Sequence, residues 1–264
     1  MNYREKDFLK ENLKELPYFR ALIRAVESRF YQTLNFDSPI LDLGTGDGHF
    51  AKTIFIQNID CGVDPDFLAL EHARKATLYD LLINAHGSEI PYPDEYFKTV
   101  FSNSVLEHIE DIDSVLEEVF RITKPNAFFY FCVPNQNFTN NLSIAIFLDK
   151  IRMKQMGKIY RQFFNRISRH YHCLAPIEWE KKLSAFGFNI VEYWNYFSPN
   201  ALSTLEWGHY IGLPYWFSKK IFDRWVLLPK INQSIIYEII KRIYLENQKQ
   251  EEGAYTFFIC QKAK

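Results

Sequence analysis

Residues 40–50 read ILDLGTGDGHF, and this stretch decides the fold. Its first four residues form a short apolar run, which is typical of a buried parallel strand. Gly44, Gly46 and Gly48 follow at alternate positions, and glycine lets the backbone turn tightly and lets a ligand approach main-chain N–H groups. Helical spacing resumes at Phe50. A strand, a glycine loop and a helix N-terminus together predict a nucleotide-type cradle at the carboxyl end of a strand, the alternative being a plain glycine-rich turn.

The glycine spacing argues against a dinucleotide site. A dinucleotide fingerprint needs G-x-G-x-x-G, whereas here the third glycine comes one residue early, at Gly48, and His49 stands where that glycine belongs. Asp42 lies inside the strand, where its carboxylate favours a cationic ligand over a pyrophosphate. These two departures disfavour a nicotinamide-dependent dehydrogenase.

The run from Asp42 to Gly48 resembles motif I of the class I S-adenosylmethionine (SAM) dependent methyltransferases. The resemblance implies that Asp42, Gly44, Thr45 and Gly46 hold the methionine end of SAM. It also implies a Rossmann-like fold, against which the rest of the chain can be compared.

A second short strand follows at residues 59–65 and ends in Asp64. Asp64 comes about 20 residues after Gly44, the spacing at which an acid reaches a ribose hydroxyl. A carboxylate can accept hydrogen bonds from both ribose hydroxyls, and its charge strengthens them. By resemblance Asp64 is the ribose-binding acid, the alternative being that it caps a helix beginning near Asp66.

Residues 85–97 are similar to the stretch that lines the adenine in this family, usually acid-Ala-x-x-Leu-Pro-Phe. His86 and Gly87 replace the acid and the small apolar residue. The resemblance implies that the backbone of Gly87 and Ser88 meets the adenine edge, and it leaves open which residue contacts the amino group.

Residues 99–111 resemble the methyltransferase type 11 group, with its Val-Leu-x-His segment. The apolar strand ends at Ser102, so Asn103 is expected to form the floor near the sulfonium. His108 is a candidate catalytic residue that could face the methyl group, or a structural histidine. An amphipathic helix over 112–122 and a strand over 128–133 are expected next.

The whole chain, 1–264, is expected to form one domain. The prediction places N-terminal helices in 1–38, the cofactor-binding core in 39–135, and two insertions, 136–173 and 198–252, that form a substrate lid. The core resumes with a helix at 175–186, a strand at 188–197, and a last strand from 253. The fold class is therefore α/β, with a Rossmann-like, seven-stranded, mostly parallel sheet whose last strand is antiparallel, inserted beside the strand that starts at Phe188.

The composition of the chain argues against several classes of binding partner. The formal net charge is −1, so no nucleic-acid footprint is expected. The four cysteines show no metal-ligand spacing, and we expect no metal site and a reducing, cytoplasmic compartment. The N-terminal residues 1–16 do not resemble a signal peptide, and no apolar run approaches the ~20 residues of a membrane span.

The two insertions should determine the acceptor. His172, near Tyr171, is a second catalytic candidate, as a general base. The alternative is that it only anchors the insertion to the core. Aromatic and basic residues alternate over 207–228, and we favour the core of a helical lid over peripheral membrane contact.

The sequence thus predicts direct, SN2-like transfer of the SAM methyl group to a small-molecule acceptor, with a lipid-linked, quinone-like or sugar-containing molecule suggested by the aromatic insertion. Methyl transfer needs in-line positioning more than a strong base. The alternative is a SAM-binding regulatory or partner protein without transferase activity. The acceptor atom and the oligomeric state are left open.

Overall fold

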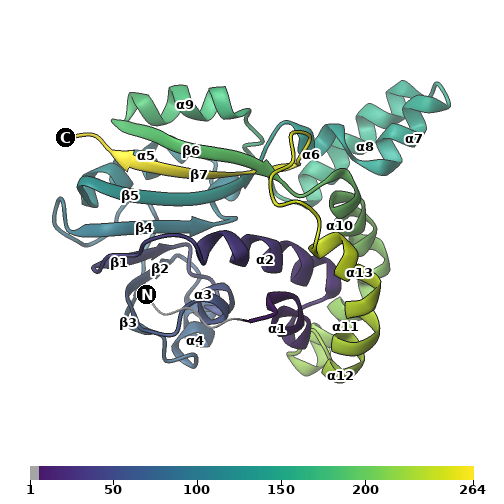
Figure 1. Cartoon of the computed structure of the whole chain (residues 1–264), viewed down its shortest axis with the longest axis horizontal. Coiled ribbons are helices and arrows are strands. Elements are labelled where there is room, and N and C mark those ends of the chain that lie inside the picture. The colour runs from purple at the N-terminus through teal and green to yellow at the C-terminus, as the bar shows by residue number, and fades with distance from the viewer. Residues whose placement is uncertain (1–5) are drawn as a thin grey trace.

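The computed structural model describes residues 6–264 and shows a three-layer α/β/α arrangement (Figure 1). Its seven strands form one sheet in the order β3-β2-β1-β4-β5-β7-β6, in which β7 is antiparallel to both of its neighbours. The expected fold class is therefore confirmed. The strands are β1 (Ile40–Leu43), β2 (Ile59–Asp64), β3 (Tyr79–Asn84), β4 (Phe97–Asn103), β5 (Thr123–Pro134), β6 (Phe188–Tyr196) and β7 (Tyr255–Lys262).

Helices cover both faces of the sheet and divide its core in two. One apolar cluster joins α1 (Phe8–Glu15), α2 (Tyr18–Tyr31) and α3 (His49–Ile54) to the sheet. The other joins α5 (Ile112–Ile122) and α9 (Pro176–Ala185) to the opposite face. Neighbouring residues of β1 belong to different clusters, Ile40 to the first and Leu41 to the second, because successive side chains point to opposite faces of a sheet.

The carboxyl ends of β1, β2 and β4 meet at one edge. Asp42 of β1 pairs with Gly62 of β2 on one side and with Phe101 of β4 on the other, both in parallel register. This register places the segments that follow these three strands next to one another, as the sequence motifs require.

Two strands differ from the sequence analysis. Strand β3 was not identified from the sequence, because it is an edge strand with most of its residues partly or fully exposed, and therefore lacks a clear apolar pattern. Strand β5 begins at Thr123 rather than 128, because Thr123 pairs with Phe97 across an irregularity in the ladder. Asn126 adopts a positive φ of 62° there, a conformation that asparagine tolerates better than most residues.

The N-terminal segment forms two helices. Asp7 caps α1 by accepting from the N–H groups of Leu9 and Lys10. The apolar face of α2 is buried; its residues are Phe19, Leu22, Ile23, Val26 and Phe30. Residues 1–5 of the N-terminal segment lie outside the described residues.

The first insertion consists of a short helix and an antiparallel pair of longer helices that projects from the body of the molecule (Figure 1). It contains α6 (Asn137–Asn140), α7 (Ser143–Lys150) and α8 (Lys154–Ile167). Arg161 of α8 pairs with Asp149 of α7 at 2.7 Å, and a Cβ on Gly157 would come within 2.5 Å of the same carboxylate. Gly157 therefore allows the two helices to pack closely. We call α7 and α8 the amphipathic hairpin.

The second insertion forms a column of helices beside α1 and α2 (Figure 1). It contains α10 (Pro199–Ile211), α11 (Leu213–Phe222), α12 (Pro229–Ile231), the π-helical turn η2 (Asn232–Ile236) and α13 (Tyr237–Tyr244). Buried Glu206 of α10 ties the two insertions together, because its carboxylate accepts from the N–H and hydroxyl of Ser143 and from the hydroxyl of Tyr160.

The aromatic stretch 207–228 is not the buried core of a lid, and the favoured interpretation of it was wrong for most of its large side chains. Trp207, Trp216, Phe217 and Phe222 are each 46% to 58% exposed. Val226 is buried, and Trp225 lies under the guanidinium of Arg20. The exposed residues lie on helix faces that no other described element covers.

Candidate cofactor and acceptor site

A cleft of about 520 Å³ opens at the carboxyl edge of the sheet. Its floor is the glycine loop and the ends of β2 and β4, and its walls come from α2 and from both insertions. The residues that line it include Arg24, Asp42, Gly44, Thr45, Gly46, Asp64, Asn103, Ser104, Glu107, His108, Phe138, His170, His209 and Trp225. The two insertions therefore reach the cleft, as a substrate lid would require.

The glycine loop is shaped for close approach. Gly44 has a φ of +78° and a Cβ there would lie 2.4 Å from the side chain of Val105, so only glycine fits. Gly46 has a φ of +56° and open space where a Cβ would be. A side chain at Gly46 would be strained and would extend into the cleft. This open position is a cradle that a ligand can fill.

Asp64 lies at the end of β2 and holds the glycine loop. The N–H of Gly46 donates to Oδ2 of Asp64 at 2.7 Å, and the N–H of Asp66 donates to Oδ1 at 2.8 Å. The helix α4 (Phe67–Arg74) is capped by Asp66, which accepts from Leu68 and Ala69. Asp64 is therefore not the cap, and the remaining lone pairs of its carboxylate can accept from two hydroxyls of a ligand.

Asp42 is buried beneath the glycine loop. Its Oδ2 accepts a 2.6 Å hydrogen bond from the hydroxyl of Tyr79. Burial raises the pKa of Asp42 to about 7, against the opposing effect of the Tyr79 hydrogen bond. A cationic group in the cleft would favour the ionised carboxylate. The hydroxyl of Thr45 donates a hydrogen bond to the main-chain carbonyl of Asp42 at 3.0 Å.

A second lobe of about 480 Å³ shares Gly44, Asp64 and His108 with the first and extends to residues 85–87 and 109–111. Gly87 is buried, and a Cβ there would lie 3.3 Å from Leu43. Ser88 does not line this lobe; its hydroxyl pairs with Nδ1 of His86 at 2.8 Å, and the residue borders a separate surface depression beside Glu118 and Arg121. The structure thus brings Gly87, but not Ser88, to the lobe beside Asp64.

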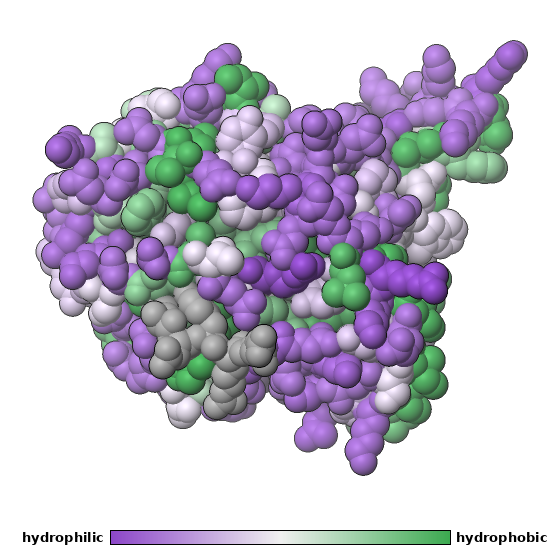
Figure 2. All heavy atoms as spheres, viewed as in Figure 1, coloured by the Kyte–Doolittle hydropathy of each residue, from purple (hydrophilic) through white to green (hydrophobic). Residues whose placement is uncertain are grey.

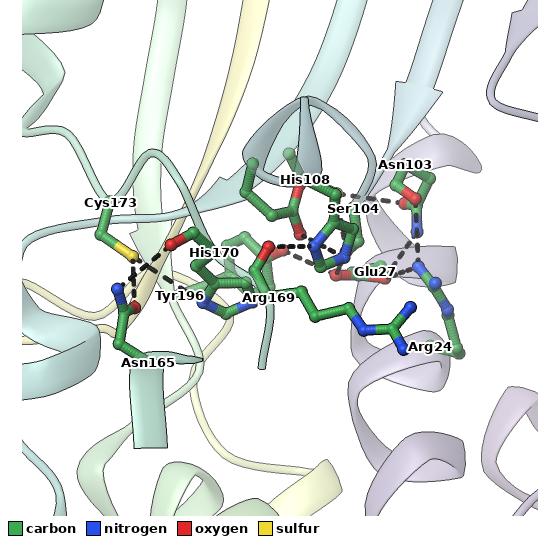
Figure 3. A network of polar contacts seen from close by, with 12 residues as sticks. Arg24, Glu27, Asn103, Ser104, His108, Asn165, Arg169, His170, Cys173 and Tyr196 are labelled. Carbon is green, nitrogen blue, oxygen red and sulfur yellow. Dashed lines mark hydrogen bonds and ion pairs between the residues drawn. The ribbon is translucent and has the colours of Figure 1, made fainter. Parts of the chain in front are cut away.

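Asn103 ends β4 and belongs to a buried polar network centred on Glu27 of α2 (Figure 3). Asn103 donates to Oε2 of Glu27 at 2.7 Å, and Arg24 pairs with the same oxygen at 3.1 Å. The hydroxyls of Ser104 and Tyr196 each donate to Oε1 at 2.9 Å. The network fixes the turn after β4, in which Ser104 has a positive φ of 52°.

The sequence analysis missed Glu27. One feature of the sequence could have indicated it: Glu27 lies on the apolar face of a helix, between Val26 and Phe30. A carboxylate on a buried face is found only where it is fully paired, so this position predicts a buried polar network.

His108 lies in the 3-10 turn η1 (Leu106–His108) and borders both lobes. It is one of three acidic or imidazole side chains that converge here, with Glu107 and His170, and their ligand atoms lie within 4.8 Å of one another. Burial raises the pKa of Glu107 to about 8 and lowers the pKa of His170 to about 3. Burial also lowers the pKa of His108. Near neutral pH all three side chains are therefore uncharged.

Glu107 and His170 were not singled out from the sequence, since 63 residues separate them and only the first insertion brings His170 back to the cleft. His172 does not reach either lobe. Its Nε2 contacts the carbonyl oxygen of Glu110 at 3.2 Å, and the main-chain N–H groups of Tyr171 and His172 donate to the carbonyl of Glu107. This is the anchoring arrangement, one of the two considered for His172.

A family model described as a methyltransferase domain matches residues 12–193. The chain belongs to this family and has the fold of the class I SAM-dependent methyltransferases, whose cofactor is SAM. The residues present fit that cofactor: the loop has open space over Gly46, and the carboxylates of Asp42 and Asp64 flank it.

Curated relatives match only a part of the chain. A sterol methyltransferase-like protein of Botryococcus braunii is 30% identical over 109 residues, 38% of this chain and 28% of that protein. A ubiquinone biosynthesis O-methyltransferase of Yersinia enterocolitica is 27% identical over 111 residues, 39% of this chain and 45% of that protein. The chain thus spans less than half the length of these relatives.

Solved structures share the fold over nearly the whole chain. A SAM-dependent methyltransferase of Thermotoga maritima superposes with a TM-score of 0.58 at 15% identity, covering 93% of this chain and 91% of that one. The [4+2]-cyclase SpnF superposes with a TM-score of 0.56 at 16% identity, covering 99% and 86%. Likeness at this level shows the fold alone, since one fold carries many activities.

Proposed function

We propose that the chain transfers a methyl group from SAM to a hydroxyl oxygen of a small, lipid-linked acceptor. The observation that carries this proposal is the course of the cleft, which runs from the glycine loop and Asp64 to the cluster of Glu107, His108 and His170. Bound SAM supplies a methyl group already activated by its sulfonium charge.

Each residue has a role in positioning. Asp42 and the loop residues Gly44, Thr45 and Gly46 are placed to hold the methionine end, with Asp64 at the ribose. Gly87 presents its main chain to the adenine, and Ser88 lies outside this arrangement. Asn103, fixed by Glu27, forms the floor near the reacting atoms.

The acceptor end is supplied by the turn after β4 and by the first insertion. His108 is placed to take the proton from an acceptor hydroxyl, because its Nδ1 lies 3.0 Å from the carbonyl oxygen of Arg169. That contact places the ring proton on Nδ1 and leaves the lone pair of Nε2 toward the cleft. His172 does not line either lobe, and its Nε2 contacts the carbonyl of Glu110, so we give it no part in this role.

The amphipathic hairpin supports a lipid-linked acceptor. On α8 the side chains of Met156, Ile159, Phe163 and Ile167 recur at helical spacing and are each 41% to 48% exposed. They form an apolar stripe that no described element covers. Ser168 and His170, which follow α8 directly, line the cleft. The stripe therefore leads to the acceptor end of the site.

The charge of this segment matches an anionic membrane surface. Residues 143–169 carry Asp149 as their only acid and contain the bases Lys150, Arg152, Lys154, Lys158, Arg161, Arg166 and Arg169, although the whole chain has a net charge of −1. Figure 2 shows this end of the molecule as hydrophilic residues beside apolar ones. Apolar and basic residues together favour an interfacial position. No helix among residues 6–264 is long and apolar enough to cross a bilayer.

The names of the curated relatives support the same acceptor class. One is similar to sterol methyltransferases and another acts in ubiquinone biosynthesis, and both names refer to lipid-soluble molecules.

The first test is calorimetric titration with S-adenosylhomocysteine and, separately, with NADH. Micromolar binding of the first and no binding of the second supports the cofactor site. Absence of S-adenosylhomocysteine binding would overturn it. If it binds but extracts of lipids and quinones yield no methylated product, the alternative without transferase activity gains support.

The second test measures sedimentation with phosphatidylcholine vesicles with and without phosphatidylglycerol. Binding only to the anionic vesicles, weakened by salt, is expected. The double variant Ile159→Ser/Phe163→Ser should lose most of this binding. Ile177→Ser on α9 is the matched control, because Ile177 is also exposed (56%) but lies outside the hairpin. Equal sedimentation of all three proteins would contradict the docking of the hairpin.

A further inference from the structure

Glu107 and His108 lie next to each other at the acceptor end of the cleft, at a distance too long for a direct hydrogen bond. Oε1 of Glu107 lies 3.9 Å from Nε2 of His108, and Oε2 is buried and has no hydrogen-bond partner among the described residues. Because Nδ1 of His108 points to the carbonyl of Arg169, its Nε2 offers a lone pair and not a proton. A proton or a metal cation can lie between these two groups, and a bound cation would favour the ionised form of the buried carboxyl group.

His170, from the first insertion, completes the group. Its ring lies 5.3 Å from the ring of His108 and against the edge of Phe138, with centroids 4.7 Å apart (Figure 3). Its Nδ1 lies 3.8 Å from the sulfur of Cys173. The ring is therefore held by its neighbours, and the donor atoms of all three side chains lie within 4.8 Å of one another.

We propose that Glu107, His108 and His170 bind one divalent transition-metal cation, which holds the acceptor oxygen. Two imidazoles and one carboxylate form a ligand set that suits Zn²⁺, Mn²⁺, Fe²⁺ or Co²⁺ and leaves coordination positions open for an acceptor. No metal site was predicted from the sequence, because the ligands come from distant segments and include no cysteine.

The three side chains must move slightly closer together to bind a metal ion. Metal–ligand bonds of about 2.0–2.2 Å place donor atoms roughly 3–4 Å apart. The ring nitrogens must therefore approach the carboxylate by about an ångström. Arg24 is paired with Glu27, and Oε2 of Glu107 has no hydrogen-bond partner among the described residues, so this oxygen is open to a cation. The carbonyl of Arg169 is the outer contact that orients a metal-binding histidine.

With the ion bound, Nε2 of His108 is a metal ligand, so the ion takes over from His108 the activation of the acceptor hydroxyl. This role rests on the proposed function. A divalent cation lowers the pKa of a bound hydroxyl, so its proton leaves to water and the oxygen keeps the electron pair. That pair forms the new bond to the methyl carbon, and the electrons of the sulfur–carbon bond return to sulfur. Atoms and charge balance without a further reactant.

The test uses Co²⁺ as the probe, added to chelator-stripped, untagged full-length protein and followed by visible absorption. We expect one equivalent of Co²⁺ to produce ligand-field bands, which Zn²⁺ abolishes by competition. Glu107→Gln and His170→Gln should weaken Co²⁺ binding by about a hundredfold or more, given that even outer contacts of a metal site are worth about ten- to a hundredfold. His172→Gln is the matched control, because His172 lies two residues away but outside the cluster, and it should bind as the unaltered chain does.

The results separate this inference from the proposed function. Failure of Co²⁺ to change the spectrum, or equal binding by Glu107→Gln, His170→Gln and the unaltered chain, overturns the metal site. Thermal melts of each variant show whether it is folded. If S-adenosylhomocysteine binds while Co²⁺ does not, the metal site alone fails. If Co²⁺ binds while S-adenosylhomocysteine does not, the proposed function fails and the metal site stands.

Discussion

Single carboxylates in the cleft have distinct surroundings, and these surroundings determine what each can do. Asp64 is partly exposed and accepts one main-chain hydrogen bond on each oxygen. Asp42 is buried, and its carboxylate accepts a hydrogen bond from the hydroxyl of Tyr79. The first therefore suits neutral hydroxyls of a ligand, and the second suits a cation.

Replacing Asp64 with alanine should weaken S-adenosylhomocysteine binding at least tenfold while the protein stays folded. Hydrogen bonds to a charged group are worth about 1.5–3 kcal/mol each, and the loop also loses its contact with Gly46. Calorimetry measures the affinity. Asp66→Ala is the control, since it removes the cap of α4, which costs about 1 kcal/mol of stability, and leaves the ribose contact in place. Unchanged affinity in Asp64→Ala would remove the ribose assignment.

Affinity for the cofactor should rise with pH through the pKa of Asp42, which burial has raised to about 7. Below that pKa the carboxyl is neutral and attracts no cation, and above it the carboxylate is charged. The stability of the free protein should change with pH in the opposite direction. The pKa of Asp42 is higher in the folded than in the unfolded chain, so the contribution of this group to folding stability is lost as pH rises toward about 7.

The measurement is calorimetric titration of SAM at several pH values from about 6 to about 8, around the pKa of this group. Asp42→Asn should bind more weakly and lose the pH dependence. If the affinity of Asp42→Asn varies with pH as steeply as that of the unaltered chain, another group is responsible.

At the scale of elements, α2 holds the turn after β4 through one buried side chain. Glu27 receives four hydrogen bonds from Arg24, Asn103, Ser104 and Tyr196, which lie on α2, β4, the following turn and β6. The position of the acceptor end thus depends on a helix that precedes the first strand in the sequence.

Replacing Glu27 with alanine should lower the free energy of unfolding by about 3–5 kcal/mol, because it leaves the buried side chains of Asn103 and Tyr196 without their acceptor and the partly buried Arg24 without its partner. Glu27→Gln should lose less, since it keeps the shape and part of the network. Glu11→Ala is the control; Glu11 pairs with Lys14 on the exposed face of α1, and such pairs are worth at most about 1 kcal/mol. Urea unfolding followed by circular dichroism measures all three, and equal losses for Glu27→Ala and Glu11→Ala would contradict the role of the network.

For the whole molecule, ligand binding in a cleft that joins the sheet, α2 and both insertions should stabilise all of them together. A ligand at 100 times its Kd adds about 2.7 kcal/mol. For a chain of this size we expect a rise in Tm of about 5 °C or more with S-adenosylhomocysteine. Scanning calorimetry checks this. NADH at the same concentration should leave Tm unchanged, and an equal rise with NADH would return the dehydrogenase to consideration.

Much of the cofactor half could be predicted from the sequence, because its signals are local. The strand, the glycine loop and Asp64 lie within 25 residues of one another. Gly44 and Gly46 both have a positive φ, a conformation that requires glycine and is therefore visible in the sequence. The amphipathic helix 112–122 matches α5 residue for residue. Edge strand β3 was missed because most of its residues are partly or fully exposed and it has no apolar alternation.

The acceptor half depended on contacts between distant residues. Glu27 and Asn103 are 76 residues apart, and Glu107 and His170 are 63 residues apart. The spacing of these residues in the sequence does not predict either contact. The packing of α2 against the sheet creates the first contact, and the first insertion creates the second by bringing His170 to the cleft. Ser88 shows the converse, since its motif position predicted an adenine contact and its hydroxyl pairs with His86 beside a different depression.

The sequence by itself therefore determined the fold class and the cofactor cradle, since strand periodicity, glycine conformation and a carboxylate at a strand end are properties of short segments. Only the tertiary structure decided which polar groups are buried together at the acceptor end, and which apolar faces of the insertions stay uncovered. Those properties depend on how segments tens of residues apart pack, and packing is decided by the whole chain at once.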